Sequence, residues 1–168
     1  SSNRRDGFSE TQTATNGFGE NRDNIHTDSG RLQALVKFAP DTTLLMSYDV
    51  STNKGSGPNY YDLTSGVIPT KNLVDTGNSL EGKFNDRASG WKAELKAGLG
   101  IADLTYIYGN RTTKMREDYS VGILGLLTHN DVHQTSHELR LSSRGSSPLQ
   151  WVGGLFVFNE KTTGNQLD

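Results

Sequence analysis

Three histidines, His129, His133 and His137, stand four residues apart in the last third of the sequence. On a helix this spacing would place the imidazoles on one face, where they could ligate a metal ion. A separation by an even number of residues also places them on one face of an extended strand. The surrounding Thr, Asn, Asp and Gln residues do not indicate a helix, so we expect loop and strand-end histidines and predict no metal site. His129 and His133 are kept as candidates for contact with a ligand.

Two tyrosines form a second candidate group. Tyr60 and Tyr61 follow residues 55–59, whose Gly, Ser, Pro and Asn content indicates a loop. Exposed aromatic rings in such a loop can stack on an iron chelate or a sugar. Alternatively, the rings pack the loop on itself.

Basic residues recur within segments of alternating polarity, and these can attract an anionic ligand. They are Arg31, Lys37, Lys92, Lys96, Arg111 and Arg140. Alternatively, they pair with acidic residues of the same segments, which are Asp49, Glu94 and Glu138. The candidate ligand-binding residues are therefore Tyr60, Tyr61, Arg111, His129 and His133.

Composition argues against several classes of protein. The 168 residues carry 17 Lys and Arg against 19 Asp and Glu, so no bulk positive charge suggests a nucleic-acid partner. The absence of Cys excludes thiol chemistry and disulfides. No run of about 18 apolar residues predicts a transmembrane helix, and no signal-peptide core is visible. No Ser, His and Asp arrangement supports catalysis, so we expect neither an enzyme nor a cofactor.

The elements that must position these side chains are strands, because apolar and polar residues alternate with a period of two. The cleanest example is residues 91–99, where Trp, Ala and Leu alternate with Lys, Glu and Gly. Together with a half-strand near residues 4–10, we expect about seven strands. The others are residues 31–38, 43–51, 104–111, 137–142 and 149–158.

The connections between these strands alternate in length. Short turns are expected near Pro40, Gly100 and Gly145, and long polar loops near residues 11–29, 52–88 and 115–136. Short turns at one end and long loops at the other are typical of an outer-membrane β-barrel. The strands also reach the roughly 9–11 residues that a tilted membrane strand needs.

Two interpretations of the alternation remain open. In a soluble antiparallel sheet, the apolar face would be a core; in a membrane barrel, it would meet lipid and the charged face would line the lumen. Aromatic residues near strand ends and charges deep inside strands favour the barrel. We therefore predict an all-β, antiparallel up-and-down meander, with residues 1–168 forming part of a large transmembrane β-barrel.

Several segments resemble the early barrel strands of TonB-dependent outer-membrane receptors. The most specific is Ser-His-Glu-Leu-Arg-Leu-Ser-Ser at residues 136–143, followed by Pro-Leu-Gln-Trp-Val-Gly-Gly-Leu-Phe-Val-Phe at residues 148–158. Residues 3–8, 30–38, 43–49 and 104–111 also resemble strands of that family.

The resemblance implies a receptor in the outer membrane of a Gram-negative bacterium. Such a receptor is a barrel closed by a plug domain, and it imports a scarce ligand, most often a ferric siderophore, with energy from TonB. Its partners would be outer-membrane lipid, an iron chelate and TonB, the last through a plug region not in this chain. About seven strands against about 22 in such transporters imply an early third of the barrel, unable to transport alone. The alternatives are a passive porin or ligand-specific channel, and a soluble or surface-exposed β-sheet binding module.

Overall fold

Alternating polarity builds the regular elements of this protein, seen in a computed structural model. The structure describes residues 1–7, 9–13, 17–22, 24–56, 83–121, 124–145 and 148–167. Every regular element within these ranges is a strand. The strands are β1 (Ser2–Arg5), β2 (Ser9–Thr13), β3 (Gly17–Arg22), β4 (Ile25–Ala39), β5 (Thr42–Ser56), β6 (Lys83–Gly98), β7 (Ala102–Val121), β8 (Leu124–Ser143) and β9 (Val152–Leu167). No helix in the described part of the chain has the length and apolar character to cross a membrane.

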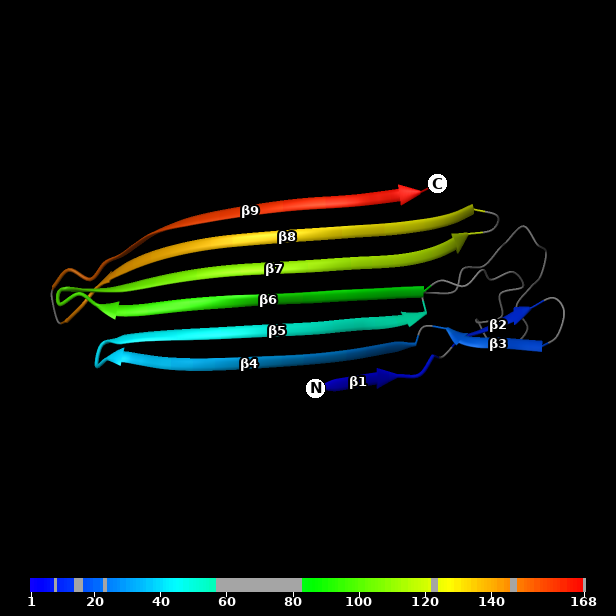
Figure 1. Ribbon diagram of the computed structural model, residues 1–168, viewed down its shortest axis with the longest axis horizontal. Helices are drawn as coiled ribbons and strands as arrows, with labels where there is room; N and C mark the ends of the chain where they lie inside the picture. The colour runs from blue at the N-terminus through cyan, green and yellow to red at the C-terminus, as the bar shows by residue number, and fades with distance from the viewer. Residues whose placement is uncertain are drawn as a thin grey trace.

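Seven strands form one antiparallel sheet in the order β1-β4-β5-β6-β7-β8-β9, and β2 and β3 form a separate hairpin. From β4 to β9, each strand pairs with the next along the chain (Figure 1). The predicted antiparallel meander of about seven strands is therefore confirmed, as one open sheet. β1 pairs only with the beginning of β4, from Arg5 opposite Ile25 to Ser2 opposite Asp28.

The three predicted short connections lie together at one end of the sheet (Figure 1). Two residues join β4 to β5, and three join β6 to β7. Gly100 and Gly145 lie in the second and third connections with φ of 83° and 91°. In this left-handed region, an L-residue with a side chain is disfavoured by roughly 1–2 kcal/mol.

Much of the sequence predicted to form long loops is strand. The loop expected near 115–136 is wrong, because β7 and β8 pair without a break from Ala102 opposite Ser143 to Val121 opposite Leu124. The loop expected near 11–29 contains β2, β3 and the start of β4. In the loop expected near 52–88, the first residues belong to β5 and the last residues belong to β6. Residues 57–82 lie outside the described ranges. The hydrogen bonds between paired strands join backbone groups. Polar side chains on both faces can therefore conceal the alternation of apolar and polar residues in the sequence without ending the strand.

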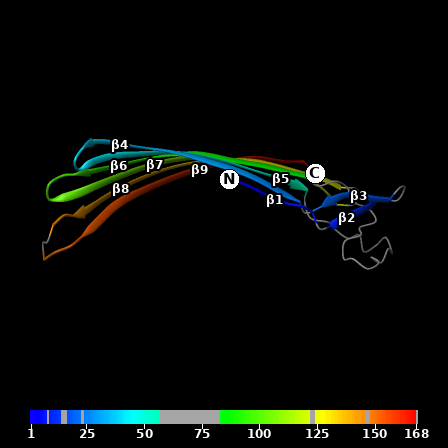
Figure 2. The same ribbon diagram turned by 90° about the horizontal axis from the view of Figure 1, so that it is seen from below.

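The sheet is a single curved layer, which Figure 2 shows edge-on. Among the side chains whose burial the structure describes, Ala102 is the one buried hydrophobic residue, at 7% exposed, whereas Leu32 and Leu155 are each 73% exposed. These side chains therefore enclose no hydrophobic core. The apolar side chains among them lie on the surface of the sheet, where a lipid or protein partner can contact them.

Residues opposite one another across the sheet form rows, and successive rows point to opposite faces. We call the apolar face the one that carries the row with Leu44, Leu95, Tyr106, Leu139 and Leu155. On this face, apolar residues extend from the short connections to the row where Tyr48 lies opposite Trp91. We call this part the apolar band, and the strand segments beyond it the outer ends.

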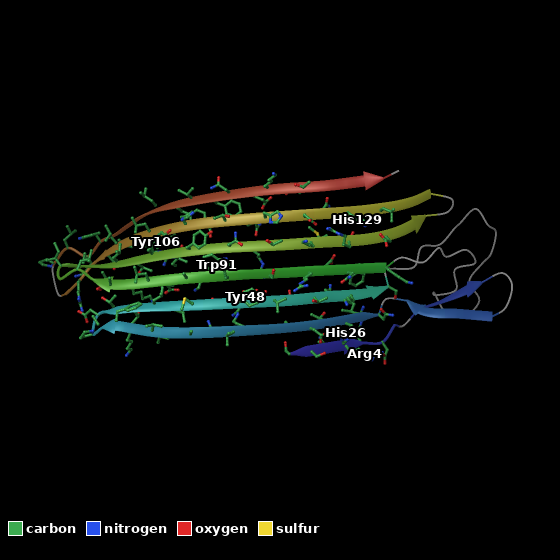
Figure 3. The ribbon with its side chains drawn as sticks, in the orientation of Figure 1. Arg4, His26, Tyr48, Trp91, Tyr106 and His129 are labelled. Atoms are coloured by element: carbon green, nitrogen blue, oxygen red, sulfur yellow. The ribbon has the colours of Figure 1, made fainter. Side chains whose placement is uncertain are left out.

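Aromatic rings on the apolar face contact one another across β6, β7 and β8. The ring centroids of Trp91 and Tyr108 are 4.7 Å apart, and those of Tyr108 and His137 are 4.9 Å apart. The Tyr106 hydroxyl and His137 Nδ1 form a hydrogen bond of 2.8 Å. Figure 3 shows Tyr48, Trp91 and Tyr106 on neighbouring strands, with His26 and His129 farther from the short connections. The two rows that hold Tyr48 and Trp91, and Tyr108 and His137, thus mark the end of the apolar band, and we call them the aromatic rows.

Candidate functional site

Arg111 lies on the face opposite the apolar band, which we call the charged face. There its guanidinium contacts Asp49 of β5, with Nη2 3.0 Å from Oδ2. Arg31 of β4 approaches the same carboxylate from the other side, with Nη2 3.9 Å from Oδ1. Three strands, β4, β5 and β7, therefore bring together an Arg–Asp–Arg cluster.

Gly90 explains how Arg111 reaches across a strand. β6 lies between β5 and β7, and Gly90 is the residue of β6 that lies opposite both Asp49 and Arg111. Gly90 is buried, and a Cβ added there would lie 2.8 Å from the Asn110 carbonyl oxygen and 3.5 Å from Arg111 Cγ. Because this position has no side chain, the Arg111 guanidinium can lie over β6 and meet Asp49.

A hollow of about 410 Å³ surrounds this cluster on the charged face, and Gln33, Lys92 and Gln134 also line it. Two guanidinium groups share one carboxylate, so the cluster carries an excess positive charge. The side chains of Arg31 and Arg111 are 65% and 47% exposed, which leaves donor groups accessible from solvent. Such an arrangement can bind a carboxylate or phosphate through charge-assisted hydrogen bonds.

The other basic residues predicted for this face are mostly paired. Glu94 accepts ion pairs from Lys92 at 2.9 Å and from Lys96 at 3.0 Å. Arg140 pairs with Glu138. Lys37 forms no ion pair with any residue that the structure describes. Pairing within the sheet therefore accounts for most of these cations. In two clusters, Arg31–Asp49–Arg111 and Lys92–Glu94–Lys96, two cations share one carboxylate.

The candidate histidines lie on the apolar face, away from Arg111. Gln134 lies opposite Arg111, so its neighbour His133 points to the other face. There, His133 Nδ1 is 3.1 Å from the Thr112 hydroxyl, and His129 Nε2 is 3.6 Å from Asp118 Oδ1. The sheet therefore separates Arg111 from His129 and His133, and these three residues do not form one site.

Two further expectations concern metal binding and the tyrosines. Across the ranges that the structure describes, no three His, Asp or Glu side chains gather in a way that could hold a metal ion. Even spacing places the histidines on one face, but four residues along a strand separate them by about 13 Å. Tyr60 and Tyr61 lie outside the described residues.

Sequence reasoning did not select Asp49, Gly90 or Gln134 as site residues. All three belong to the same row as Arg31 and Arg111, from β4 to β8. The signal that could have found them is the register of strands far apart in sequence, which alternation within one strand does not supply.

Comparisons with protein-family models, curated proteins and solved structures found no match to this chain.

Proposed function

We propose that this chain forms part of the barrel wall of an outer-membrane receptor of the TonB-dependent class. The whole receptor would import a scarce ligand, by default a ferric siderophore, with energy delivered by TonB. The observation that supports this proposal is the two-faced sheet. One face carries an exposed apolar band that ends in aromatic rows. The other carries ion-paired charges, together with the exposed apolar side chains of Leu35, Phe156 and Phe158.

The dimensions of the apolar band suit a membrane. Along β6, the band extends from Trp91 to Leu99, which is roughly 27 Å at about 3.4 Å per residue. At a strand tilt of about 40°, this length covers about 21 Å of membrane thickness, near the roughly 25 Å band of outer-membrane barrels. Leu99, Ile101 and Trp151 are exposed at the end with the short connections. We assign that end to the periplasmic side.

The charged face would line the lumen, where water and ligand solvate its side chains. The Arg31–Asp49–Arg111 cluster would then offer guanidinium groups to an anionic part of the ligand. The sheet has open edges at β9 and at the short β1 with the part of β4 that β1 does not cover, and open edges are not tolerated in lipid. Further strands must therefore pair with both edges, and transport belongs to the complete barrel.

Uptake by intact cells tests this function. Cells that carry the gene should accumulate a radiolabelled ferric chelate, and cells without it should not. Uptake should stop when TonB is deleted, and expression should rise under iron starvation. A passive porin predicts uptake that persists without TonB. Uptake of the chelate that requires neither the gene nor TonB would overturn the receptor proposal.

Site-directed labelling tests the membrane position separately. The chain has no Cys, so single substitutions introduce unique spin-label sites. In the intact protein in its membrane, a label at Leu44→Cys should meet dissolved oxygen in lipid, and one at Thr52→Cys should meet a water-soluble nickel chelate. Both residues lie on the apolar face of β5. A soluble β-sheet module predicts equal access of the nickel chelate to both positions in detergent-free buffer.

A further inference from the structure

Asp49 is the one carboxylate among the described residues that line the hollow on the charged face. The cations of the lining are Arg31, Lys92 and Arg111. Lys92 is paired with Glu94 at 2.9 Å. The remaining group therefore has two positive charges and one negative charge, and Asp49 determines how much of the positive charge an incoming anion meets.

The two guanidinium groups do not contact Asp49 equally. Arg111 Nη2 donates a hydrogen bond of 3.0 Å to Oδ2, whereas Arg31 Nη2 lies 3.9 Å from Oδ1, which is too far for a hydrogen bond. The Arg31 side chain is also the more exposed of the two. An anion that enters the hollow can therefore bind Arg31 directly, while it shares Arg111 with Asp49.

The sheet itself holds the Asp49 carboxylate between the two guanidinium groups. Asp49 lies opposite Arg31 on one side and opposite Gly90 on the other, and Gly90 has no side chain that would keep Arg111 away. The Asp49 side chain is only 26% exposed. Its charge is therefore a fixed part of the hollow, and every anion bound there interacts with it.

Other carboxylates on this face are engaged elsewhere. Glu160 accepts a hydrogen bond of 2.8 Å from Gln134. Glu94 and Glu138 pair with cations on their own strands. Among the side chains that the structure describes, Asp49 is the carboxylate that contacts both guanidinium groups. It is therefore the group whose removal changes the charge of the cluster most directly.

The charge of Asp49 acts differently on anions of different charge. Coulomb energy follows the product of the charges, so Asp49 repels a dianion twice as strongly as a monoanion. The cost of removing an anion from water rises with the square of its charge. A cluster with one net positive charge therefore compensates the dehydration of one carboxylate better than that of a phosphate dianion.

We propose that Asp49 is an internal counter-ion that sets the charge selectivity of the hollow. The hollow takes a ligand whose anionic group is a single carboxylate, and it discriminates against dianionic groups such as phosphate. This inference rests on the proposal that the hollow meets an anionic part of the ligand. It assigns to Asp49 a role in specificity, whereas Arg31 and Arg111 supply the attraction.

Two anions of similar shape and different charge test the proposal: sulfate, with two negative charges, and methanesulfonate, with one. The chain has no Cys, so an environment-sensitive fluorophore at Thr113→Cys is a unique reporter on the same face as Arg111, two residues along β7. Titrations use the intact purified protein at fixed ionic strength, because salt screens exposed charges.

The variant Asp49→Asn should bind methanesulfonate roughly fivefold more tightly and sulfate roughly 25-fold more tightly. The first factor corresponds to one unit charge at about 4 Å in a medium like water, and the second is its square, because the charge of the anion doubles. The ratio of the two affinities should therefore shift about fivefold toward sulfate.

Two further variants separate charge from folding. Glu138→Gln removes one negative charge from the same face at a carboxylate that pairs with Arg140, and it should leave the ratio unchanged. The double variant Asp49→Asn/Arg31→Gln returns the cluster to one net positive charge. It should bring the ratio back toward that of the unchanged protein.

Several results would overturn the inference. They are an equal gain for both anions in Asp49→Asn, an unchanged ratio, the same shift in Glu138→Gln, or no binding of either anion to the unchanged protein and to Asp49→Asn. Failure of these titrations alone would leave the receptor proposal intact. Failure of the uptake and spin-label tests, with the expected shift in the titrations, would reject the receptor and keep the role of Asp49.

Discussion

Gly90 determines how charges are arranged on the charged face. Its missing side chain lets Arg111 of β7 reach Asp49 of β5 over the intervening strand. Glycine in a strand interior usually weakens a sheet, so its presence here is explained by the contact it permits.

The substitution Gly90→Ala should therefore destabilise the protein. The new Cβ would lie 2.8 Å from the Asn110 carbonyl oxygen, and overpacking of this kind costs about 1–3 kcal/mol. Chemical denaturation of the intact protein measures the change. Gly30→Ala is the matched control, because nothing lies within 4 Å of a Cβ there, and it should be neutral or stabilising by up to about 1 kcal/mol. Equal effects at both positions would contradict this account of Gly90.

Asp131 makes the stability of the outer ends depend on pH. A hydrogen bond from Arg116 lowers the pKa of this carboxyl below its usual value, and the charges of Arg116, Lys114 and His133 act in the same direction. A lowered folded-state pKa means that the stabilisation is complete above the unfolded pKa of about 3.9. It is lost as the pH falls through the lower folded-state value.

Hydrogen exchange at the outer ends of β7 and β8 measures this dependence. Protection factors of amides near Asp131 should fall on acidification, because protonation breaks the ion pair with Arg116. In Asp131→Asn this part of the pH dependence should be absent. An identical pH dependence in the variant and the unchanged protein would show that other groups control it.

Each long strand has two parts with different surroundings. Within the apolar band, one face is apolar and the other is mostly polar or charged, with Leu35, Phe156 and Phe158 as exposed apolar exceptions. In the outer ends, polar side chains occupy both faces. Leu139 and Thr163 represent the two parts, since Leu139 lies among Tyr106 and Leu155, and Thr163 lies opposite Asp131. A membrane around the band would make the two positions respond differently to an added charge.

We expect Leu139→Arg to lower the free energy of unfolding by about 2–4 kcal/mol in a bilayer. Thr163→Arg should lower it by about 0–1 kcal/mol. The reason is that a charge on the lipid-facing surface of a barrel is most costly near the middle of the membrane. Urea titration of the intact protein in lipid vesicles measures both values. Small and equal losses at the two positions would instead indicate a water-exposed face.

At the scale of the whole molecule, the sheet is one open layer, and the proposed barrel would need further strands at its edges. β9 lies at one edge, and β4 is covered by β1 only along its first residues. The Ser143 N–H donates to the Trp151 carbonyl at 2.9 Å, and the β8–β9 register continues without a shift. Backbone direction alternates along the ladder, so the N–H of Phe156 points away from β8, toward the open edge.

Phe156→Pro should therefore block assembly if another strand pairs with β9. Proline removes the N–H that the next strand would use, whereas Phe156→Ala removes the ring and keeps this donor. The folded fraction in isolated outer membranes, followed by heat-dependent mobility on gels, compares the two variants. Equal assembly of both variants would show that the edge of β9 needs no partner.

The residue pattern alone predicted the antiparallel meander and the short connections near Pro40, Gly100 and Gly145, because side-chain alternation and turn preferences are local properties. It failed at residues 115–136, where polar residues on both faces conceal a strand whose backbone still pairs.

Only the register of the folded sheet separated Arg111 from His133 and joined Arg111 to Asp49, which lies 62 residues away. It also placed Arg87 opposite Lys114. The physical reason is that hydrogen bonds between strands set these distances. The order of residues within one strand determines which side chains share a face, and not which ones meet across the sheet.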